Sequence, residues 1–230
     1  MTQTHNEPHF TSSQFISDVI IGMSDGLTVP FALAAGLSGA VAHNSIIITA
    51  GIAELVAGSI SMGLGGFLAG KTEQEHYASE LKREYYEVEN IPEKEKEEVR
   101  VVLAEYGISE RLQNEIAEEL SRNKNHWVDF MMRFELGMEK PDKSHATRSG
   151  LTIGLSYLVG GIVPLLSYFF SDKPLTGLKW SIVITMSFLF LFGYIKTKLT
   201  GEKPFKGALK TVYIGAIAAF AAYFIAKLIS

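Results

Sequence analysis

Long apolar runs alternate with a single charged stretch along this chain, and this pattern predicts its elements. Two runs begin at about Phe15 and Ser45 and precede the charged stretch, and three more follow it from Ser149 onward. A helix of this length crosses about 30 Å of hydrocarbon at about 1.5 Å per residue, and lysines at the ends extend the last two helices by snorkelling. The expected membrane helices cover about 15–41, 45–70, 149–171, 180–195 and 211–226.

The stretch from Lys71 to Arg148 holds 13 of the 21 basic and 19 of the 25 acidic residues, so it does not belong in a bilayer. Its first part continues the second helix, Pro92 and Ser109 start two shorter helices, and another follows near WVDFMMRFELGMEKP. The predicted fold is an all-α membrane protein with five transmembrane helices and a small helical domain inserted between helices 2 and 3. The predicted divisions are an N-terminal arm at 1–14, helices 1–2 at 15–70, the helical domain at 71–146 and helices 3–5 at 147–230.

The distribution of basic residues predicts the orientation of these helices. The charged stretch holds 13 of them and five more lysines lie between the last two helices, whereas the opposite side holds only Lys173, Lys179 and Lys227. Positively charged segments stay on the cytosolic side of a membrane. The N-terminal arm and the helical domain are therefore expected in the cytosol. The C-terminus follows an odd number of helices, so it is expected outside the cytosol or in a lumen.

Composition narrows the remaining classes of function. The net charge of -4 and the lack of an aromatic and basic platform argue against a nucleic-acid partner. The absence of cysteine excludes disulfides and thiolate metal sites. No Lys or Arg precedes the first apolar run, so the N-terminus does not resemble a secretory signal. His5 and His9 lie in this polar arm, where a solvated segment is a simpler interpretation than a metal site.

Two carboxylates lie inside the first two apolar runs, where a bilayer disfavours them. Asp25 is deep in the first run and Glu54 is deep in the second, and the 28 residues between them include no Asp, Glu, Lys or Arg. A carboxylate at the bilayer centre costs at least about 2.5 kcal/mol. Such residues typically face a water-filled path, a bound cation or a proton relay. The simpler alternative is a carboxylate near a helix end that reaches interfacial water.

Two further residues suggest a path beside these carboxylates. Pro30 has no N–H to donate to the carbonyl of Gly26, which predicts a kink and a free backbone oxygen next to Asp25. Broken membrane helices often supply ion ligands in this way, although proline kinks without ligands are also common. Met62 follows Glu54 by eight residues, about 80° around the helix, so both side chains can border one cavity.

Small residues recur every four positions in each of the first two helices. This spacing lets helix backbones approach closely in lipid. We expect these helices to pack on one another or across an oligomer interface, and we expect a homodimer with the first helix at its symmetric interface. The sets are Ala32, Gly36 and Ala40 in the first helix and Ala53, Ala57, Ser61, Gly65 and Ala69 in the second.

Three groups of possible metal ligands lie in the charged stretch. Glutamates three or four positions apart share one helix face and can chelate a cation, and methionine thioethers favour later divalent metals such as Fe²⁺. Each group alone also has an explanation without metal, because Glu-rich helices are usually solvated and methionines usually belong to a core. The groups are Glu80, Glu84 and Glu87, then Glu95 and Glu98, then Met131, Met132 and Glu135.

Two other classes of function stay open on these residues. Glu73 and His76 match the Glu-x-x-His spacing of di-iron carboxylate proteins, which suggests a membrane-bound oxidase, but the second copy that such a site needs is missing. A structural membrane protein with a charged helical stalk is the other class. Neither explains carboxylates in both the membrane helices and the inserted domain as well as a metal transporter does.

The chain contains, in order, SDGLTVPFALAAGLSGA, TAGIAELVAGSISMGLGGFLA, HYASELKREYYEVE and WVDFMMRFELGMEKPD. These motifs closely resemble those of the vacuolar iron transporter family, also called the CCC1-like family. The resemblance extends from about Phe10 to the C-terminus. It implies a dimeric, proton-coupled exporter of cytosolic Fe²⁺ rather than an enzyme. Each subunit would have five membrane helices and a cytosolic metal-binding domain, in a vacuolar-type or a bacterial inner membrane.

The resemblance also implies roles for single residues. Asp25, Glu54 and Met62 fall on translocation-path positions, where Asp25 would exchange a proton for the metal. Glu93 and Glu97 compete with two of the positions that match the metal-binding domain. Those matched positions are Glu84, Glu87, Glu95, Glu98, Met131, Met132 and Glu135. No cofactor is implied beyond the transported metal, for which Mn²⁺, Zn²⁺ and Co²⁺ are further candidates.

Overall fold

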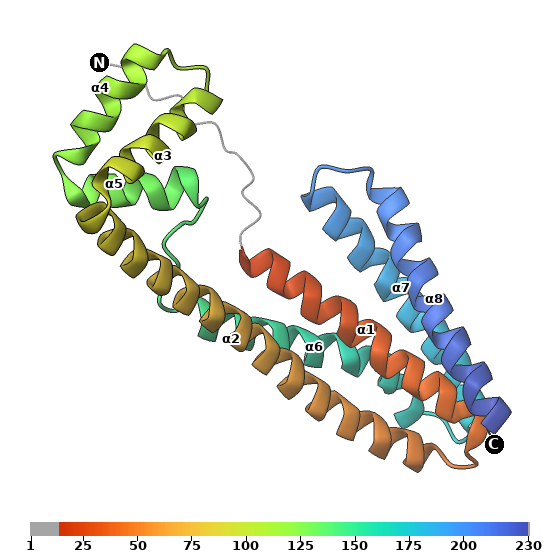
Figure 1. Ribbon diagram of the computed structural model, residues 1–230. Coiled ribbons are helices and arrows are strands. Elements are labelled where there is room, and N and C mark those ends of the chain that lie inside the picture. The colour runs from red at the N-terminus through yellow and green to blue at the C-terminus, as the bar shows by residue number, and fades with distance from the viewer. Residues whose placement is uncertain (1–13, 230) are drawn as a thin grey trace, which may run out of the picture. The chain divides into compact units, whose positions relative to one another are not determined.

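The structure is a computed structural model, and it describes residues 14–229 (Figure 1). Every regular element in this range is a helix, which confirms the predicted all-α class. His5 and His9 lie outside the described residues. The elements are α1 (Gln14–Ala40), α2 (Asn44–Asn90), α3 (Pro92–Glu105), α4 (Glu110–Ser121), α5 (Lys124–Phe130), the π-helix η1 (Met131–Glu135), α6 (His145–Phe169), α7 (Pro174–Leu199) and α8 (Pro204–Ile229).

Five of the described helices, α1, α2, α6, α7 and α8, are long and apolar enough to cross a membrane, which confirms the five predicted spans. The helix α2 is 47 residues long and continues from its apolar half into the charged stretch, as predicted. The helices α7 and α8 begin earlier than the predicted starts at 180 and 211. Pro174 and Pro204 each start a helix because proline suits the first helical position.

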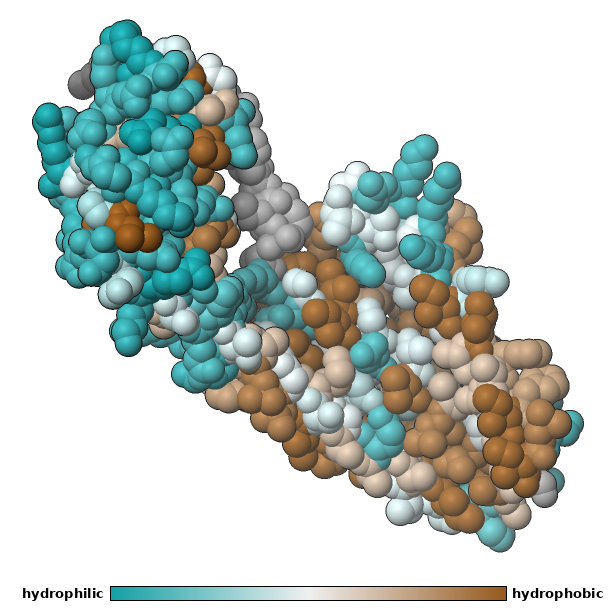
Figure 2. All heavy atoms as spheres, viewed as in Figure 1, coloured by the Kyte–Doolittle hydropathy of each residue, from teal (hydrophilic) through white to brown (hydrophobic). Residues whose placement is uncertain are grey.

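The chain divides into two compact units. The inserted unit is Ala69–His145, and the membrane unit contains the chain before and after it. Figure 2 shows a mainly hydrophilic surface on the inserted unit and broad apolar surface on the membrane unit. Apolar side chains at the surface of long helices are what a lipid environment requires.

The inserted unit has a hydrophobic core of its own. Pro92 starts α3, Gly107 lets the chain leave this helix in the left-handed region at φ 74°, and Ser109 precedes α4. All five helical segments of the unit contribute apolar side chains to the core, so burial of this surface holds them together. The buried core residues are Val88, Val99, Leu103, Ala117, Trp127, Val128, Met131 and Met132.

In the membrane unit, α6 lies between α1 and α2, and glycines make the approach close. A Cβ atom at Gly26 of α1 would lie 2.3 Å from the carbonyl oxygen of Tyr157 on α6. On the other side of α6, a Cβ atom at Gly63 of α2 would lie 2.9 Å from the carbonyl oxygen of Gly150. Helices approach this closely in lipid where a side chain is absent, because packing and not solvent exclusion drives their association.

The predicted packing of α1 on α2 through their sets of small residues is wrong within one chain. In the α2 set, Ala53, Ala57, Ser61 and Gly65 are exposed. In the α1 set, Gly36 is buried against α8, where its Cβ atom would lie 3.2 Å from the carbonyl oxygen of Ala222. The glycines of α6 provide the close contacts instead. Gly36 is therefore occupied within the chain, and the homodimer with α1 at its symmetric interface stays a prediction.

Candidate metal-binding sites

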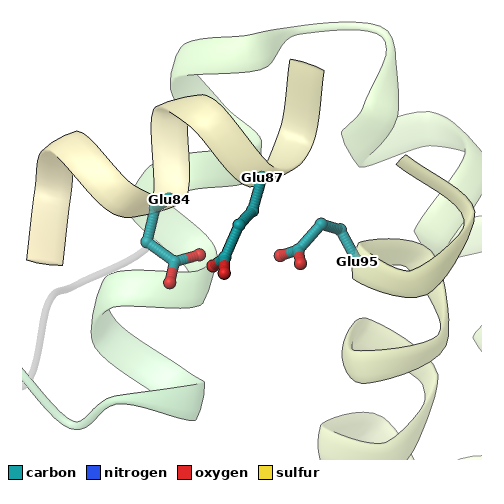
Figure 3. A group of neighbouring side chains, drawn as sticks. All are labelled: Glu84, Glu87 and Glu95. Atoms are coloured by element: carbon teal, nitrogen blue, oxygen red, sulfur yellow. The ribbon is translucent and has the colours of Figure 1, made fainter. Parts of the chain in front are cut away.

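Three carboxylates converge where α2 ends and α3 begins. Glu84, Glu87 and Glu95 each offer an oxygen atom, and these atoms all lie within 4.8 Å of one another. Figure 3 shows Glu84 and Glu87 pointing from α2 toward Glu95 on α3. The local sequence explains the convergence. Glu84 and Glu87 are three residues apart and share one face of α2. Pro92 starts α3 directly after the end of α2. The first turn of α3 thereby brings Glu95 to the same place.

Two members of this carboxylate cluster are buried without adequate partners. Glu84 is 2% exposed and Glu95 is 0% exposed. Among the described residues, both oxygens of Glu95 are buried without a hydrogen bond, and so is Oε2 of Glu84. A buried carboxylate without a partner is costly unless it is neutralised or coordinates a metal.

The basic side chains near the cluster lie closer to other glutamates than to Glu84 and Glu95. Arg83 approaches Oε2 of Glu80 to 2.6 Å and Glu87 to 3.6 Å, but its distance to Glu84 is 4.0 Å. Lys94 pairs with Glu98 at 2.9 Å. The two most buried carboxylates therefore keep a deficit of positive charge at the centre of the cluster.

Burial and mutual repulsion change the acidity of this cluster. Burial raises the pKa of Glu84 from its ordinary value of 4.5 to about 7, repulsion from Glu135 and Glu87 adds to the shift, and Arg83 opposes it. Burial raises the pKa of Glu95 to about 8, and repulsion from Glu98 and Glu84 adds to that shift. A divalent cation would reverse both causes, because it compensates the negative charge and replaces the lost solvation.

The two glutamates that compete with the α3 positions lie at the surface. The side chain of Glu93 is 81% exposed and pairs with Lys96, and that of Glu97 is 63% exposed and pairs with Arg100. Glu95 alone among these α3 glutamates joins the three-carboxylate cluster. The position in the helix, and not the local sequence, separates a buried Glu95 from its exposed neighbours.

The methionines predicted as ligands lie in the hydrophobic core of the inserted unit. Met131 is 0% exposed and Met132 is 1% exposed, and both pack in the cluster around Trp127. They belong to the π-helix η1, a wide turn that sequence patterns did not reveal and that often marks functional sites. Glu135 ends this turn with an exposed side chain. Partial desolvation, and then repulsion from Glu98 and Glu87, raises the pKa of Glu135.

A second constellation lies in the membrane unit around Tyr157 of α6. Its hydroxyl donates a hydrogen bond to Oε1 of Glu54 on α2. The other oxygen of Glu54, Oε2, is buried and without a hydrogen bond among the described residues. Sequence reasoning missed Tyr157, and its only mark in the sequence is a phenol within the uncharged run GLTIGLSYLVGGIVP.

Asp25 lies on α1 next to a close contact with Tyr157. A Cβ atom on the neighbouring Gly26 would lie 2.3 Å from the carbonyl oxygen of Tyr157, so the α1 backbone beside Asp25 packs against α6. The carbonyl of Gly26, which Pro30 leaves without its helical donor, lies 3.3 Å from a Cβ atom placed on Gly161 of α6. Tyr157 thus contacts Glu54 through its hydroxyl and contacts the α1 backbone next to Asp25 through its own backbone.

Met62 is partly buried on α2, eight residues after Glu54. Its predicted place beside the two carboxylates stays a prediction.

A chain with five apolar helices, with carboxylates inside two of them and more carboxylates gathered in a helical insertion, fits the class of multi-pass membrane transporters for cations. Comparison with known proteins defines the family. The sequence model of the VIT family matches residues 16–227, and the chain belongs to this family.

Named relatives agree with this assignment. The chain is 52% identical to "Vacuolar iron transporter 1" of Arabidopsis thaliana over 225 residues, which are 98% of this chain and 90% of the relative. It is 48% identical to "Vacuolar iron transporter 2" of Oryza sativa subsp. japonica, over 97% of this chain and 91% of the relative. It is 42% identical to "Protein CCC1" of Saccharomyces cerevisiae, over 93% of this chain and 69% of the relative. The chain is thus a multi-pass membrane transporter and not an enzyme, and metal-ion transport across a membrane is its class of function.

Proposed function

We propose that this protein moves Fe²⁺ out of the cytosol across a membrane in exchange for protons, and that the Glu84, Glu87 and Glu95 cluster captures the metal. One observation carries the proposal: Glu95 is fully buried, and neither of its oxygens has a hydrogen bond among the described residues. A divalent cation would give all three carboxylates a shared partner. The relatives at 52% identity carry the name of iron transporters, which supports Fe²⁺ as the metal.

Carboxylate oxygens alone discriminate weakly between divalent transition metals, so Mn²⁺, Zn²⁺ and Co²⁺ are further proposed substrates. Glu98 and Glu135 extend the negative field of the cluster, because each raises the pKa of one of its members by repulsion. Met131 and Met132 remain proposed ligands. Both thioethers are buried in the inserted unit, as are Glu84 and Glu95.

Inside the membrane unit, we assign the translocation path to Asp25, Glu54 and Met62 and add Tyr157. The unpartnered oxygen of Glu54 supports a ligand role for this residue. Asp25 is the proposed exchanging group, which would carry either a proton or the metal. A divalent metal would favour ionisation and expel that proton. Occupancy by proton and by metal is then mutually exclusive, as antiport requires.

The orientation and the assembly belong to the same proposal. The basic residues of the insertion and of the segment between α7 and α8 support a cytosolic inserted unit and a C-terminus on the opposite side. We propose a homodimer whose interface lies on α2 and not on α1. The exposed small residues Ala53, Ala57, Ser61 and Gly65 of α2 support an interface there, since Gly36 of α1 is buried by α8.

Proteoliposomes with an acidic lumen and a metal-sensitive dye inside test the function. The protein should accumulate Fe²⁺ in the lumen and release protons from it. The double variant Glu84→Gln with Glu95→Gln should lose metal binding in calorimetry and slow the uptake. Glu93→Gln with Glu97→Gln is the matched control, since it removes two exposed carboxylates from the same segment. Oxygen consumption by the Fe²⁺-loaded protein without accumulation of metal would instead indicate an oxidase.

A further inference from the structure

The α7–α8 hairpin ends in a lysine-lined pocket that the proposed transport path does not use. The pocket has a volume of about 600 Å³. Lys196 near the end of α7 lines it together with Lys203, Lys206 and Lys210 at the start of α8, and Glu202 is the acidic residue in its wall. Four lysines against one glutamate give the pocket a marked positive charge.

These lysines lack acidic partners among residues 14–229. In the part of the chain that the structure describes, none of the four forms an ion pair, and neither does Glu202. By contrast, Lys94 and Lys96 of the inserted unit each pair with a glutamate. Unpaired positive charges that share one pocket repel one another, and a polyvalent anion bound between them would remove this repulsion.

The close packing of α7 and α8 keeps these lysines together. Gly207 brings α8 so close to α7 that a Cβ atom there would lie 1.7 Å from Oγ1 of Thr197. This contact holds the start of α8, with Lys206, against the end of α7, with Lys196. The 26-residue helix α8 begins at Pro204, so its first-turn N–H groups and its positive dipole end lie at the same pocket.

One face of α8 runs from basic to apolar along this helix. Lys206, Lys210 and Ile214 are successive neighbours at four-residue spacing, and Ile214 also lines the pocket. Ile214 and Ile217 are about half exposed on this membrane-spanning helix. Figure 2 shows hydrophilic side chains gathered at this end of the hairpin, next to apolar surface. A ligand with a phosphate group and an adjacent hydrocarbon chain matches this sequence of surfaces.

We propose that this pocket binds the phosphate-bearing headgroup of an anionic membrane lipid, with the lipid chains along the Ile214 face of α8. Lysines at a membrane surface attract anionic headgroups, with a contribution of about 1 kcal/mol each. Soluble phosphate compounds share the headgroup chemistry but lack the chains. The lipid and the soluble compound therefore differ in whether they use the apolar part of the site.

Native mass spectrometry of the full-length protein in detergent tests the proposal with three probes. They are dioctanoyl phosphatidylinositol 4-phosphate, dioctanoyl phosphatidylcholine and the soluble inositol 1,4-bisphosphate. We expect the anionic lipid to bind at least about tenfold more tightly than the other two. Lys206→Gln with Lys210→Gln should weaken this binding about thirtyfold, which corresponds to the loss of two lysine contributions.

Two further variants separate charge from folding. Lys173→Gln with Lys179→Gln removes two exposed lysines at the opposite end of α7 and should leave the affinity unchanged. Lys206→Arg with Lys210→Arg keeps both charges and should keep binding. Equal binding of the zwitterionic lipid would overturn the proposal, and so would undiminished binding by Lys206→Gln with Lys210→Gln. Tighter or equal binding of inositol 1,4-bisphosphate would overturn the assignment to a lipid.

Discussion

The Tyr157 hydroxyl on α6 donates a hydrogen bond to Glu54 on α2, and this bond joins two membrane-spanning helices through a carboxylate. Only one oxygen of Glu54 is satisfied in this way, since the other is buried without a hydrogen bond among the described residues. The phenol therefore holds the carboxylate in place and leaves one oxygen free. Such an arrangement suits a ligand that must be oriented but still available to an ion.

The variant Tyr157→Phe should leave both oxygens of Glu54 without a donor. We expect a loss of about 1–3 kcal/mol in the free energy of unfolding, because a buried polar group loses its partner. Metal uptake into proteoliposomes should slow about tenfold. This corresponds to an increase of about 1.4 kcal/mol in the activation free energy when Glu54 is no longer oriented. Tyr168→Phe is the control on the same helix, since the Tyr168 hydroxyl bonds to Ser38 and not to a carboxylate. Equal slowing by both variants would argue against a special role for Tyr157.

A second prediction concerns the contact that positions Asp25. In Gly26→Ala, the new Cβ atom would lie 2.3 Å from the Tyr157 carbonyl oxygen, so α1 and α6 must separate. Overpacking of this kind costs about 1–3 kcal/mol or more, measured as thermal unfolding in detergent. Ser187→Ala on α7 changes an exposed side chain and should alter the stability by less than about 0.5 kcal/mol. Similar stability of the two variants would contradict the close packing of α1 on α6.

Much of the architecture could be predicted from local patterns. Hydropathy indicated the five spans, and Pro92 marked the start of α3 because proline suits the first helical position. These features depend on a few consecutive residues. They need no knowledge of which helices become neighbours.

The parts that could not be predicted depend on partners far away in the sequence. Tyr157 meets Glu54 across 103 positions, and no periodicity in either helix encodes that contact. The small residues of α2 looked like a packing surface, yet α6 approaches α2 through other positions such as Gly63. Glu93, Glu95 and Glu97 also look alike in the sequence. Only the packing of the folded inserted unit makes one of them, Glu95, buried.

The raised pKa values of Glu84 and Glu95 predict a pH dependence of the metal-free protein. Folded Glu84 and Glu95 keep protons up to about pH 7 and 8, whereas the unfolded chain loses them near 4.5. The folded state binds more protons in this window, so its stability falls as the pH rises from about 5 to 8. The ionisation of Glu84 lowers the free energy of unfolding by up to about 3 kcal/mol over this range.

Fluorescence of Trp127 in the core of the inserted unit measures this change, after Trp180→Phe removes the only other tryptophan. Glu84→Gln should flatten the dependence, since it cannot ionise. Metal should bind more tightly as the pH rises, because the ion must displace the protons. Stability that increases from pH 5 to 8 without metal would show that these two carboxyls are not the protonated groups.

The last prediction concerns coupling, and it compares two aspartates on one helix face. Asp18 and Asp25 are seven residues apart on α1, but only Asp25 lies next to the Gly26–Tyr157 contact. In proteoliposomes with an acidic lumen, Asp25→Asn should abolish metal-driven proton release, because an amide cannot exchange a proton for a cation. Metal binding by the inserted unit should persist, since Glu84, Glu87 and Glu95 are intact. Asp18→Asn should keep most of the coupled transport. Coupled transport by Asp25→Asn at the rate of the unchanged protein would exclude Asp25 as the exchanging group.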